Sequence, residues 1–307
     1  MSALSPGTSI LRQTFVFIRP AGLTRIRPNT ALHLMRDKAE EVHGLRRMQG
    51  SAATPAALAR CGEAMRLKVA SYNIRKAIGS DRRRSPERVL QVLREVDADI
   101  VALQEADRRF GQRAAVLPPH LLEEHSDWQS VGLGMRATSM GWHGNAILVR
   151  KSARIIDCEQ LHLPALEPRG AVMADVAIAN ATVRIIGMHL DLSGLWRRRQ
   201  AAAILAHVGA SGDAMPTVMM GDLNEWSRAA GCLRDFGASF RFADTGPSFH
   251  ARRPIARLDR IMVSPELRID ACGVHQSPAA RVASDHLPIW ANLATQEGAS
   301  VRRPSED

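Results

Sequence analysis

The apolar positions between residues 65 and 294 fall into short runs that predict alternating strands and helices. In "MRLKVASYNI" (65–74), the apolar Leu67 and Val69 alternate with basic residues, the period of two that is typical of a strand. The apolar run within "DIVALQE" (99–105) predicts a second, buried strand. The chain therefore begins its ordered part with two strands separated by a polar segment.

That intervening segment carries the signals of a helix in "SPERVLQVLREV" (85–96). Ser85 is expected to cap the N-terminus, with Pro86 at the first helical position and Glu87 in the first turn. The apolar residues of the segment fall on one face at helical spacing. They are Val89, Val92, Leu93 and Val96.

Further apolar runs predict seven more strands, and the residues around 180–181 indicate a hairpin between two of them. The strands are expected at 144–149, 153–163, 169–179, 182–190, 216–224, 258–264 and 287–293. Helices are expected at 196–209 and 228–236. Many strands, some in hairpins and with helices between them, indicate a mixed α/β domain.

The composition narrows the class of protein. The 307 residues are 45% hydrophobic, enough for one large domain or two small ones. Only 4% are aromatic, which argues against a multi-aromatic platform for stacking nucleic-acid bases. Four widely spaced cysteines form no C-x-x-C pair, so we expect reduced thiols in a cytoplasmic protein.

The net charge of +10 is unevenly distributed. Residues 1–64 hold nine Lys/Arg and four Asp/Glu and show no sustained period. We predict a disordered basic extension or an over-long start before Met65; a targeting or regulatory role is also compatible with this segment. Residues 65–294 form the predicted folded domain, and 295–307 a disordered tail. Basic charge suits any polyanion, including phospholipid surfaces and nucleic acid.

Polar side chains stand at the ends of six predicted strands. A single strand that ends on a carboxylate is most often only leaving the core, but six such ends predict a shared site at one sheet edge. The residues are Asn73, Glu105, His189, Asp191, Asp222, Asn224, Asp259, Ser284, Asp285 and His286.

The chemistry of this set is coherent. Carboxylates and amides are hard oxygen ligands, which suit Mg²⁺ or Mn²⁺ better than zinc. Two histidines and Arg169 suit the stabilisation of charge on a phosphoryl oxygen, although Arg169 also fits an exposed turn. The sequence has no G-x-x-x-x-G-K-[ST] loop and no G-x-S-x-G elbow, so P-loop hydrolysis and serine-esterase chemistry lack support.

The same residues lie in ordered motifs that resemble a known superfamily. The motifs are "SYNIRK", "ALQE", "EPRGAV", "GMHLD", "GDLNEW", "LDRIMVS" and "SDHLP". Together they resemble the endonuclease/exonuclease/phosphatase superfamily of metal-dependent phosphoesterases, over about residues 66–294. The resemblance implies a deoxyribonuclease-like α/β fold, a four-layer α/β/β/α sandwich of two mixed sheets.

The resemblance also implies a metal site and a nucleophile site. Glu105 corresponds to the principal metal ligand, with Asn73 beside it and Asp285 completing or bridging the metal site. Asp222 corresponds to the residue that holds or deprotonates the attacking water. Asn224 would hydrogen-bond the scissile phosphate or the nucleophile.

Four further residues would act on the substrate phosphate. By resemblance, His189 contacts the phosphate and Arg169 is a candidate phosphate clamp. His286 would face the phosphoryl oxygens as a proton donor or as a partner of the nucleophile, with Asp259 orienting its ring. His143 precedes a strand and fits either the pocket or ordinary packing.

Two positions depart from the family pattern. Nuclease members often carry an acid two residues after the first Asn, where this chain has Arg75, so a second metal position is doubtful. Several members have an aromatic residue after the acid at position 259, where this chain has Arg260.

We therefore expect a phosphodiesterase of the endonuclease/exonuclease type that depends on Mg²⁺ or Mn²⁺ and works by in-line attack of water. Its substrate would be nucleic acid or, alternatively, a phospholipid head group, cleaved by a phosphodiesterase or phosphatase of the same superfamily. No membrane span and no obligate protein partner are evident. A non-catalytic binding module is the remaining alternative, but such a protein is expected to have lost Glu105, Asp222 or His286.

Overall fold

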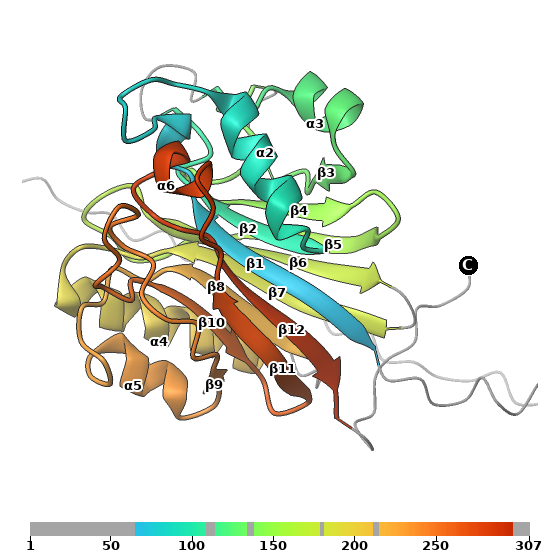
Figure 1. The fold of residues 1–307 in the computed structure, drawn as a ribbon. Coiled ribbons are helices and arrows are strands. Elements are labelled where there is room, and N and C mark those ends of the chain that lie inside the picture. Colours follow the sequence, from blue (N-terminus) through green and yellow to red (C-terminus); the bar gives the residue numbers. More distant parts are fainter. Residues whose placement is uncertain (1–64, 109–113, 134–137, 179–180, 211–214, 297–307) are drawn as a thin grey trace, which may run out of the picture. The chain divides into compact units, whose positions relative to one another are not determined.

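A computed structural model describes residues 65–108, 114–133, 138–178, 181–210 and 215–296. The predicted extension, 1–64, and residues 297–307 of the predicted tail, 295–307, lie outside these residues. The tail prediction began too early, because Thr295 is the last residue of a strand (Ile289–Thr295). In the described part, two six-stranded sheets pack face to face and helices cover their outer faces (Figure 1). This is the predicted four-layer α/β/β/α sandwich, which is confirmed.

The first sheet contains the predicted strand that begins near residue 65, with other strands on both sides of it. In spatial order it contains β11 (Leu267–Val274), β12 (Ile289–Thr295), β1 (Arg66–Asn73), β2 (Ile100–Gln104), β4 (Ala146–Arg150) and β3 (Trp128–Ser130). β1 runs parallel to β2 and antiparallel to β12, so the sheet is mixed.

The second sheet is also mixed. Its order is β5 (Arg154–Leu161), β6 (Gly170–Ile178), β7 (Ala181–His189), β8 (Thr217–Asp222), β10 (Asp259–Val263) and β9 (Arg241–Phe242). β7 and β8 are parallel, and the other pairs are antiparallel. β6 and β7 form the predicted hairpin, with Ile178 opposite Ala181.

Helices cover the outer face of each sheet. The first sheet is covered by α2 (Pro86–Val96), α3 (Pro119–His125) and α6 (Ala280–Ala283), and a 3-10 turn, η1 (Arg75–Ala77), follows β1. The second is covered by α4 (Gly194–Ala210) and α5 (Cys232–Gly237). None of the helices in the described ranges is long and apolar enough to cross a membrane.

Each sheet is buried on both faces. On β1, Leu67 and Val69 point into the layer between the sheets, and Ala70 and Tyr72 pack under α2. Successive residues of a strand face opposite sides, so a strand covered on both sides is apolar at nearly every position. This explains the continuous apolar runs of β2 and β8.

The predicted helix 85–96 is confirmed with its cap, because the side chain of Ser85 accepts a hydrogen bond from the backbone N–H of Arg88 at 3.3 Å. The helix predicted at 228–236 begins later, at Cys232, since Gly231 has a left-handed backbone (φ 61°). Six elements were not predicted. They are the eight-residue strand β11 and the shorter elements β3, β9, α3, α6 and η1.

Candidate active site

Three neighbouring strands of the second sheet place three predicted residues in one row. His189 at the end of β7 lies opposite Asp222 at the end of β8. Asp222 in turn lies opposite Asp259 at the start of β10. Paired positions in a sheet present their side chains on the same face. The register therefore brings together side chains that are 33 and 37 residues apart in sequence.

The first sheet contributes Asn73, the last residue of β1. Its side-chain Nδ2 donates a hydrogen bond to Oδ2 of Asp222 at 3.0 Å, so the amide bridges the two sheets. The backbone carbonyl of Asn73 accepts a hydrogen bond from Oγ of Ser284 at 2.7 Å. This contact anchors the segment that carries Asp285 and His286 beside the end of β1.

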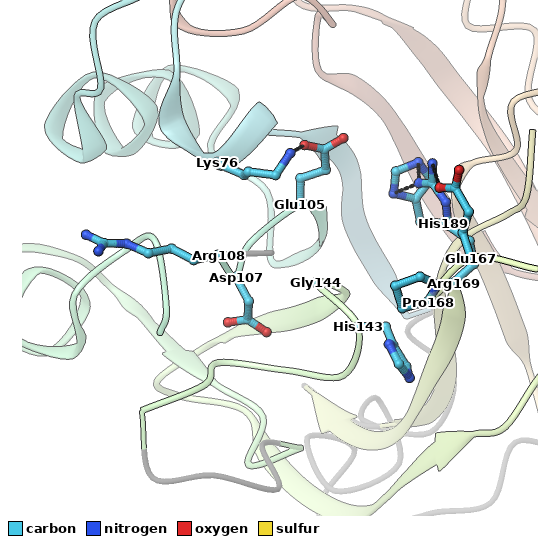
Figure 2. A pocket seen from close by; sticks show the side chains of 10 residues that line it. All are labelled: Lys76, Glu105, Asp107, Arg108, His143, Gly144, Glu167, Pro168, Arg169 and His189. Atoms are coloured by element: carbon cyan, nitrogen blue, oxygen red, sulfur yellow. Dashed lines mark hydrogen bonds and ion pairs between the residues drawn. The ribbon is translucent and has the colours of Figure 1, made fainter. Parts of the chain in front are cut away.

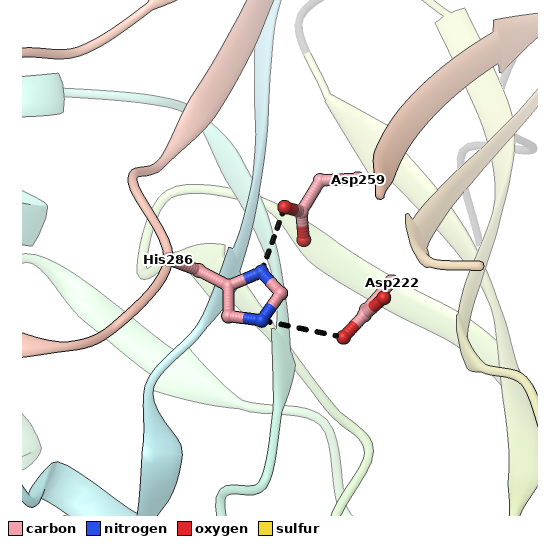
Figure 3. A group of neighbouring side chains, drawn as sticks. All are labelled: Asp222, Asp259 and His286. Atoms are coloured by element: carbon pink, nitrogen blue, oxygen red, sulfur yellow. Dashed lines mark hydrogen bonds and ion pairs between the residues drawn. The ribbon is translucent and has the colours of Figure 1, made fainter. Parts of the chain in front are cut away.

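His286 is held by two carboxylates (Figure 3). Nδ1 of His286 lies 2.9 Å from Oδ2 of Asp259, which also accepts a hydrogen bond from Oγ of Ser248. Nε2 lies 3.7 Å from Oδ2 of Asp222. Burial alone would lower the pKa of His286, but the charges of Asp259 and Asp222 outweigh it and raise the pKa to about 10. The imidazole is therefore protonated at neutral pH.

His189 is in the opposite state. Its Nε2 lies 3.4 Å from Oδ2 of Asp222, but complete burial lowers the pKa of His189 to about 3, and the charge of Arg169 adds to this effect. Nη1 of Arg169 contacts both ring nitrogens of His189 and lies 2.9 Å from Nδ1. A positive charge this close to the ring disfavours a second positive charge on the imidazole, which favours its neutral form. Asp222 thus lies between one neutral and one charged histidine.

A cavity of about 80 Å³ opens beside this cluster (Figure 2). The predicted residues Glu105, Arg169 and His189 line it. His143, which the sequence placed either in the pocket or in ordinary packing, also lines the cavity. Lys76 also lines the cavity, and its ammonium group forms an ion pair with Oε2 of Glu105. The cavity is thus lined by charged groups of both signs.

Of the remaining predicted residues in the described ranges, Asn224 is hydrogen-bonded to Asp222, whereas Asp285 and Glu105 are not. The backbone N–H of Asn224 donates to Oδ1 of Asp222 at 3.0 Å, and its side-chain Nδ2 donates to the carbonyl of Leu190 at 2.9 Å. Asp285 lies 3.3 Å from Nε of Arg75. Within the described ranges, no hydrogen bond or ion pair joins Glu105 or Asp285 directly to Asp222.

Asp191 has a structural role. Its carboxylate accepts hydrogen bonds from the backbone N–H groups of Ser193 at 2.9 Å and Leu166 at 3.3 Å, and so it shapes the loop after β7.

Sequence reasoning missed two residues of this site. Lys76 was inside the quoted motif "SYNIRK", three residues after Asn73, so the signal was present. Ser248 had no such signal, because it reaches Asp259 through a loop whose course depends on the bridge between Phe249 and His286.

The donors present fit a hard divalent cation. Glu105, Asn73 and Asp285 offer carboxylate and amide oxygens only, the ligands that Mg²⁺ and Mn²⁺ prefer. The two carboxylates are each partly exposed and each paired with a basic side chain, Lys76 or Arg75. A second group, Asp222, Asp259 and His286, has ligand atoms within 4.8 Å of one another. In that group, however, Nδ1 of His286 is already engaged with Asp259.

The fold and the sequence define the family of the protein. Residues 70–286 match the model of the Endonuclease/Exonuclease/phosphatase family, and the chain belongs to this family. Members are hydrolases with a phosphoesterase-like fold.

Individual relatives support the same fold. The uncharacterized protein YbhP of Escherichia coli K12 is 28% identical over 250 residues, which cover 74% of this chain and 95% of YbhP. A family member from Bacteroides thetaiotaomicron has a TM-score of 0.64 at 20% identity, covering 79% of this chain and 99% of that one. The mannosyl-6-phosphatase Bt3783 of the same organism has a TM-score of 0.60 at 21% identity, covering 74% and 99%. D. rerio TDP2, in complex with a single-strand DNA product, has a TM-score of 0.59 at 17% identity, covering 75% and 99%.

Proposed function

We propose that this protein is a divalent-metal-dependent phosphodiesterase that hydrolyses a phosphate ester by in-line attack of water. The observation that carries the proposal is the position of Asp222. Its carboxylate is 1% exposed, accepts hydrogen bonds from Asn73 and from the backbone of Asn224, and has an imidazole on either side. Such a carboxylate is fixed in place and suited to take a proton from a water molecule.

Each neighbour of Asp222 has a distinct part in this proposal. The protonated His286 donates to a phosphoryl oxygen or to the leaving group, and Asp259 holds its ring in position through Nδ1. The neutral His189 and the guanidinium of Arg169 bind the substrate phosphate in the adjoining cavity. Asn224 orients the water or the phosphate.

The proposed metal site consists of Glu105, Asn73 and Asp285. A bound Mg²⁺ or Mn²⁺ would supply charge neutralisation at the phosphoryl group. We assign Asp222, Asp259 and His286 to proton handling, because the hydrogen bonds of Asp259 to His286 and Ser248 already determine their arrangement.

The proposed substrate is a nucleic-acid phosphodiester, in line with the nuclease-type members of the family. A phospholipid head group is the second candidate, and one observation favours it. Large apolar side chains are exposed next to the site, among them Leu192 in the loop after His189, Leu195 in the first turn of α4, and Trp226 after Asn224. Trp226 contacts Phe249, whose ring centroid lies 4.9 Å from that of His286. Apolar side chains beside a phosphate site suit a lipid surface, although Trp226 also suits stacking on a base.

Hydrolysis assays test the proposal. The purified chain would be incubated with Mg²⁺, with Mn²⁺ or with EDTA. The panel contains plasmid DNA, an abasic-site duplex, vesicles of phosphatidylglycerol, cardiolipin or sphingomyelin, and bis-p-nitrophenyl phosphate. We expect activity that EDTA abolishes and that His286→Ala lowers by about 10²–10⁴-fold. Glu105→Gln should raise the metal concentration needed for half-maximal activity.

Matched variants control for general effects of substitution. His207→Ala, on α4, and Glu124→Gln, at an exposed position of α3, should behave as the unmodified protein does. Activity that survives EDTA, or equal rates for His286→Ala and His207→Ala, would contradict the assigned site. The preferred member of the panel decides between nucleic acid and phospholipid.

A further inference from the structure

A second cavity, of about 370 Å³, lies on the helical side of the second sheet. It shares no lining residue with the cavity beside His189. Its walls come from the segment leading into α5, from β9 and from the loop that connects β9 to β10. Apolar surface is contributed by Leu233 and Phe242, and polar surface by Thr245 and by three arginines, Arg228, Arg257 and Arg260.

Arg260 is the unusual member of this lining. It lies on β10 between Asp259 and Ile261 and is only 7% exposed. Met262, on the same face of the strand, packs in the apolar layer under α4 and α5, so Arg260 places a charged side chain beside this layer. Burying a guanidinium is energetically unfavourable unless its charge and its hydrogen-bond donors are satisfied. A residue such as Met would fill the same position without this cost.

Within the described residues, most of the hydrogen-bond donors of Arg260 have no acceptor. A guanidinium has five N–H donors, and the acceptor found for Arg260 in the described ranges is the backbone carbonyl of Asp259, at 3.1 Å from Nη1. Burial accordingly lowers the pKa of Arg260, although the charge of Asp259 partly opposes the effect.

The nearby carboxylates are engaged elsewhere. Oε2 of Glu225 accepts hydrogen bonds from Arg197 at 3.1 and 3.2 Å, and its Oε1 accepts one from the backbone of Ser227 at 3.0 Å. Asp244 forms an ion pair with Arg257. The cavity is therefore lined by three guanidinium groups and by a single carboxylate, that of Asp244.

We propose that this cavity binds a small organic anion, a phosphate monoester or a carboxylate that carries an apolar group. The anionic head would pair with Arg260 at the buried end and with Arg257 at the exposed end, with Thr245 as a further donor. The apolar part would lie against Leu233 and Phe242. The proposal concerns a site separate from the catalytic one and does not depend on the proposed reaction.

Thermal unfolding and calorimetric titration of the full chain in EDTA test this site. The probes are phenyl phosphate and benzoate, which share a ring and differ in the anionic head, with inorganic phosphate as an anion without an apolar part and phenol as a neutral ring. We expect phenyl phosphate or benzoate to raise the unfolding temperature, since a ligand that binds only the folded state stabilises it. The probe with the larger shift identifies the preferred head. Inorganic phosphate should bind more weakly, and phenol should give no shift.

Variants assign the shift to the cavity. Arg260→Met should abolish the anion-dependent shift and leave the unliganded protein at least as stable, because an uncompensated buried charge has been removed. Arg257→Ala, at an exposed position, should weaken binding by about tenfold, the loss of one hydrogen bond to a charged group. Arg268→Ala, which lies outside the cavity, and Arg169→Ala, in the catalytic cavity, should keep the shift.

Several outcomes overturn the proposal. They are the absence of a shift with both organic anions, a shift that survives Arg260→Met, and a shift that disappears with Arg169→Ala instead. Equal affinity for inorganic phosphate and phenyl phosphate would contradict the apolar part of the site. If Arg260→Met does not fold, Arg257→Ala decides: binding about tenfold weaker supports the site, and unchanged binding refutes it.

Discussion

Asn73 and Asp222 are joined by a hydrogen bond of 3.0 Å that connects the end of β1 in one sheet to the end of β8 in the other. The amide donates, so the carboxylate of Asp222 is held in one orientation by a residue 149 positions away. The proposed proton acceptor is therefore positioned by the packing of the two sheets and not by its own strand alone.

Removing this amide should reduce the rate more than the stability. We expect Asn73→Ala to lower kcat by about 10- to 100-fold, the usual effect of losing a group that orients a reacting one. Steady-state kinetics at saturating metal would measure it. Asn292→Ala, on β12, is the matched control, and a rate equal to that of the control would show that Asp222 does not need its partner.

Asp259 should affect the rate of hydrolysis because it positions the imidazole of His286. Asp259→Asn keeps the shape of the side chain but removes the charge that stabilises protonated His286. We expect kcat to fall by about 10²–10⁴-fold, since the proton donor is then both misoriented and less often protonated. Asp270→Asn, at an exposed strand position, serves as control. A loss confined to KM would indicate that Asp259 acts in substrate binding.

Lys76 should compete with the metal ion for Glu105. Its ammonium group forms an ion pair with Oε2 of Glu105, and both side chains are partly exposed. Lys76→Met should therefore lower the metal concentration for half-maximal activity by about two- to fivefold, in keeping with the strength of a partly exposed pair. A metal titration of the activity measures this. A higher metal requirement in the variant would mean that Lys76 supports the metal site.

The free energy of unfolding should depend strongly on one buried ion pair. Arg184 on β7 contacts Asp175 on β6 through two hydrogen bonds of 2.8 Å each. Asp175→Ala removes the carboxylate and leaves a buried guanidinium, which costs about 3–5 kcal/mol. Urea unfolding measures the loss, and the double variant Asp175→Leu, Arg184→Met should recover most of it.

Glu95 should make stability depend on pH. Burial raises the pKa of this carboxyl, but hydrogen bonds from Ser277, His275 and Gln91 outweigh it and lower the pKa below the ordinary 4.5. A lowered pKa means that the carboxylate stabilises the fold above pH 4.5 and loses this effect as the pH falls through the folded-state value. Glu95→Gln should therefore lower the free energy of unfolding at pH 7 by about 1 kcal/mol.

Urea unfolding at several pH values tests this dependence. The difference between Glu95→Gln and the unmodified chain should shrink as the pH is lowered below 4.5. Glu124→Gln, whose position is exposed, should show no such trend. A difference that is constant with pH would mean that the side chain stabilises the fold by packing.

The central strands were predictable because both their faces are buried. β2 and β8 show this in their apolar runs. β1 was predictable from the alternation of Leu67 and Val69 with basic residues, and α2 from the spacing of its apolar face and the cap at Ser85. β11 was missed, since it is an edge strand in which only Leu267 is fully buried and the register is irregular between Ile269 and Ala271. Local pattern carries little information where few side chains are buried and the ladder is interrupted.

The candidate site was predictable for those residues that stand at the ends of strands. His189, Asp222 and Asp259 follow from strand ends and the motifs, and the register of three strands then brings them together. The contacts of Ser248 with Asp259 and of Arg75 with Asp285 were not predictable. They depend on how loops fold over the sheet edge, which no local period encodes. The protonation states of the two histidines likewise depend on neighbours distant in sequence.

The pairing of β1 with β12 has a consequence for synthesis. The first described strand lies beside the last one, and the backbone N–H of Met65 donates to Oγ1 of Thr295 across 230 residues. A growing chain therefore leaves one edge of β1 without its partner until nearly the whole domain has emerged from the ribosome, and unpaired edges invite association with other chains. His286 also emerges among the last residues before β12. A nascent chain from which β12 has not yet emerged should consequently be inactive and prone to associate with other chains.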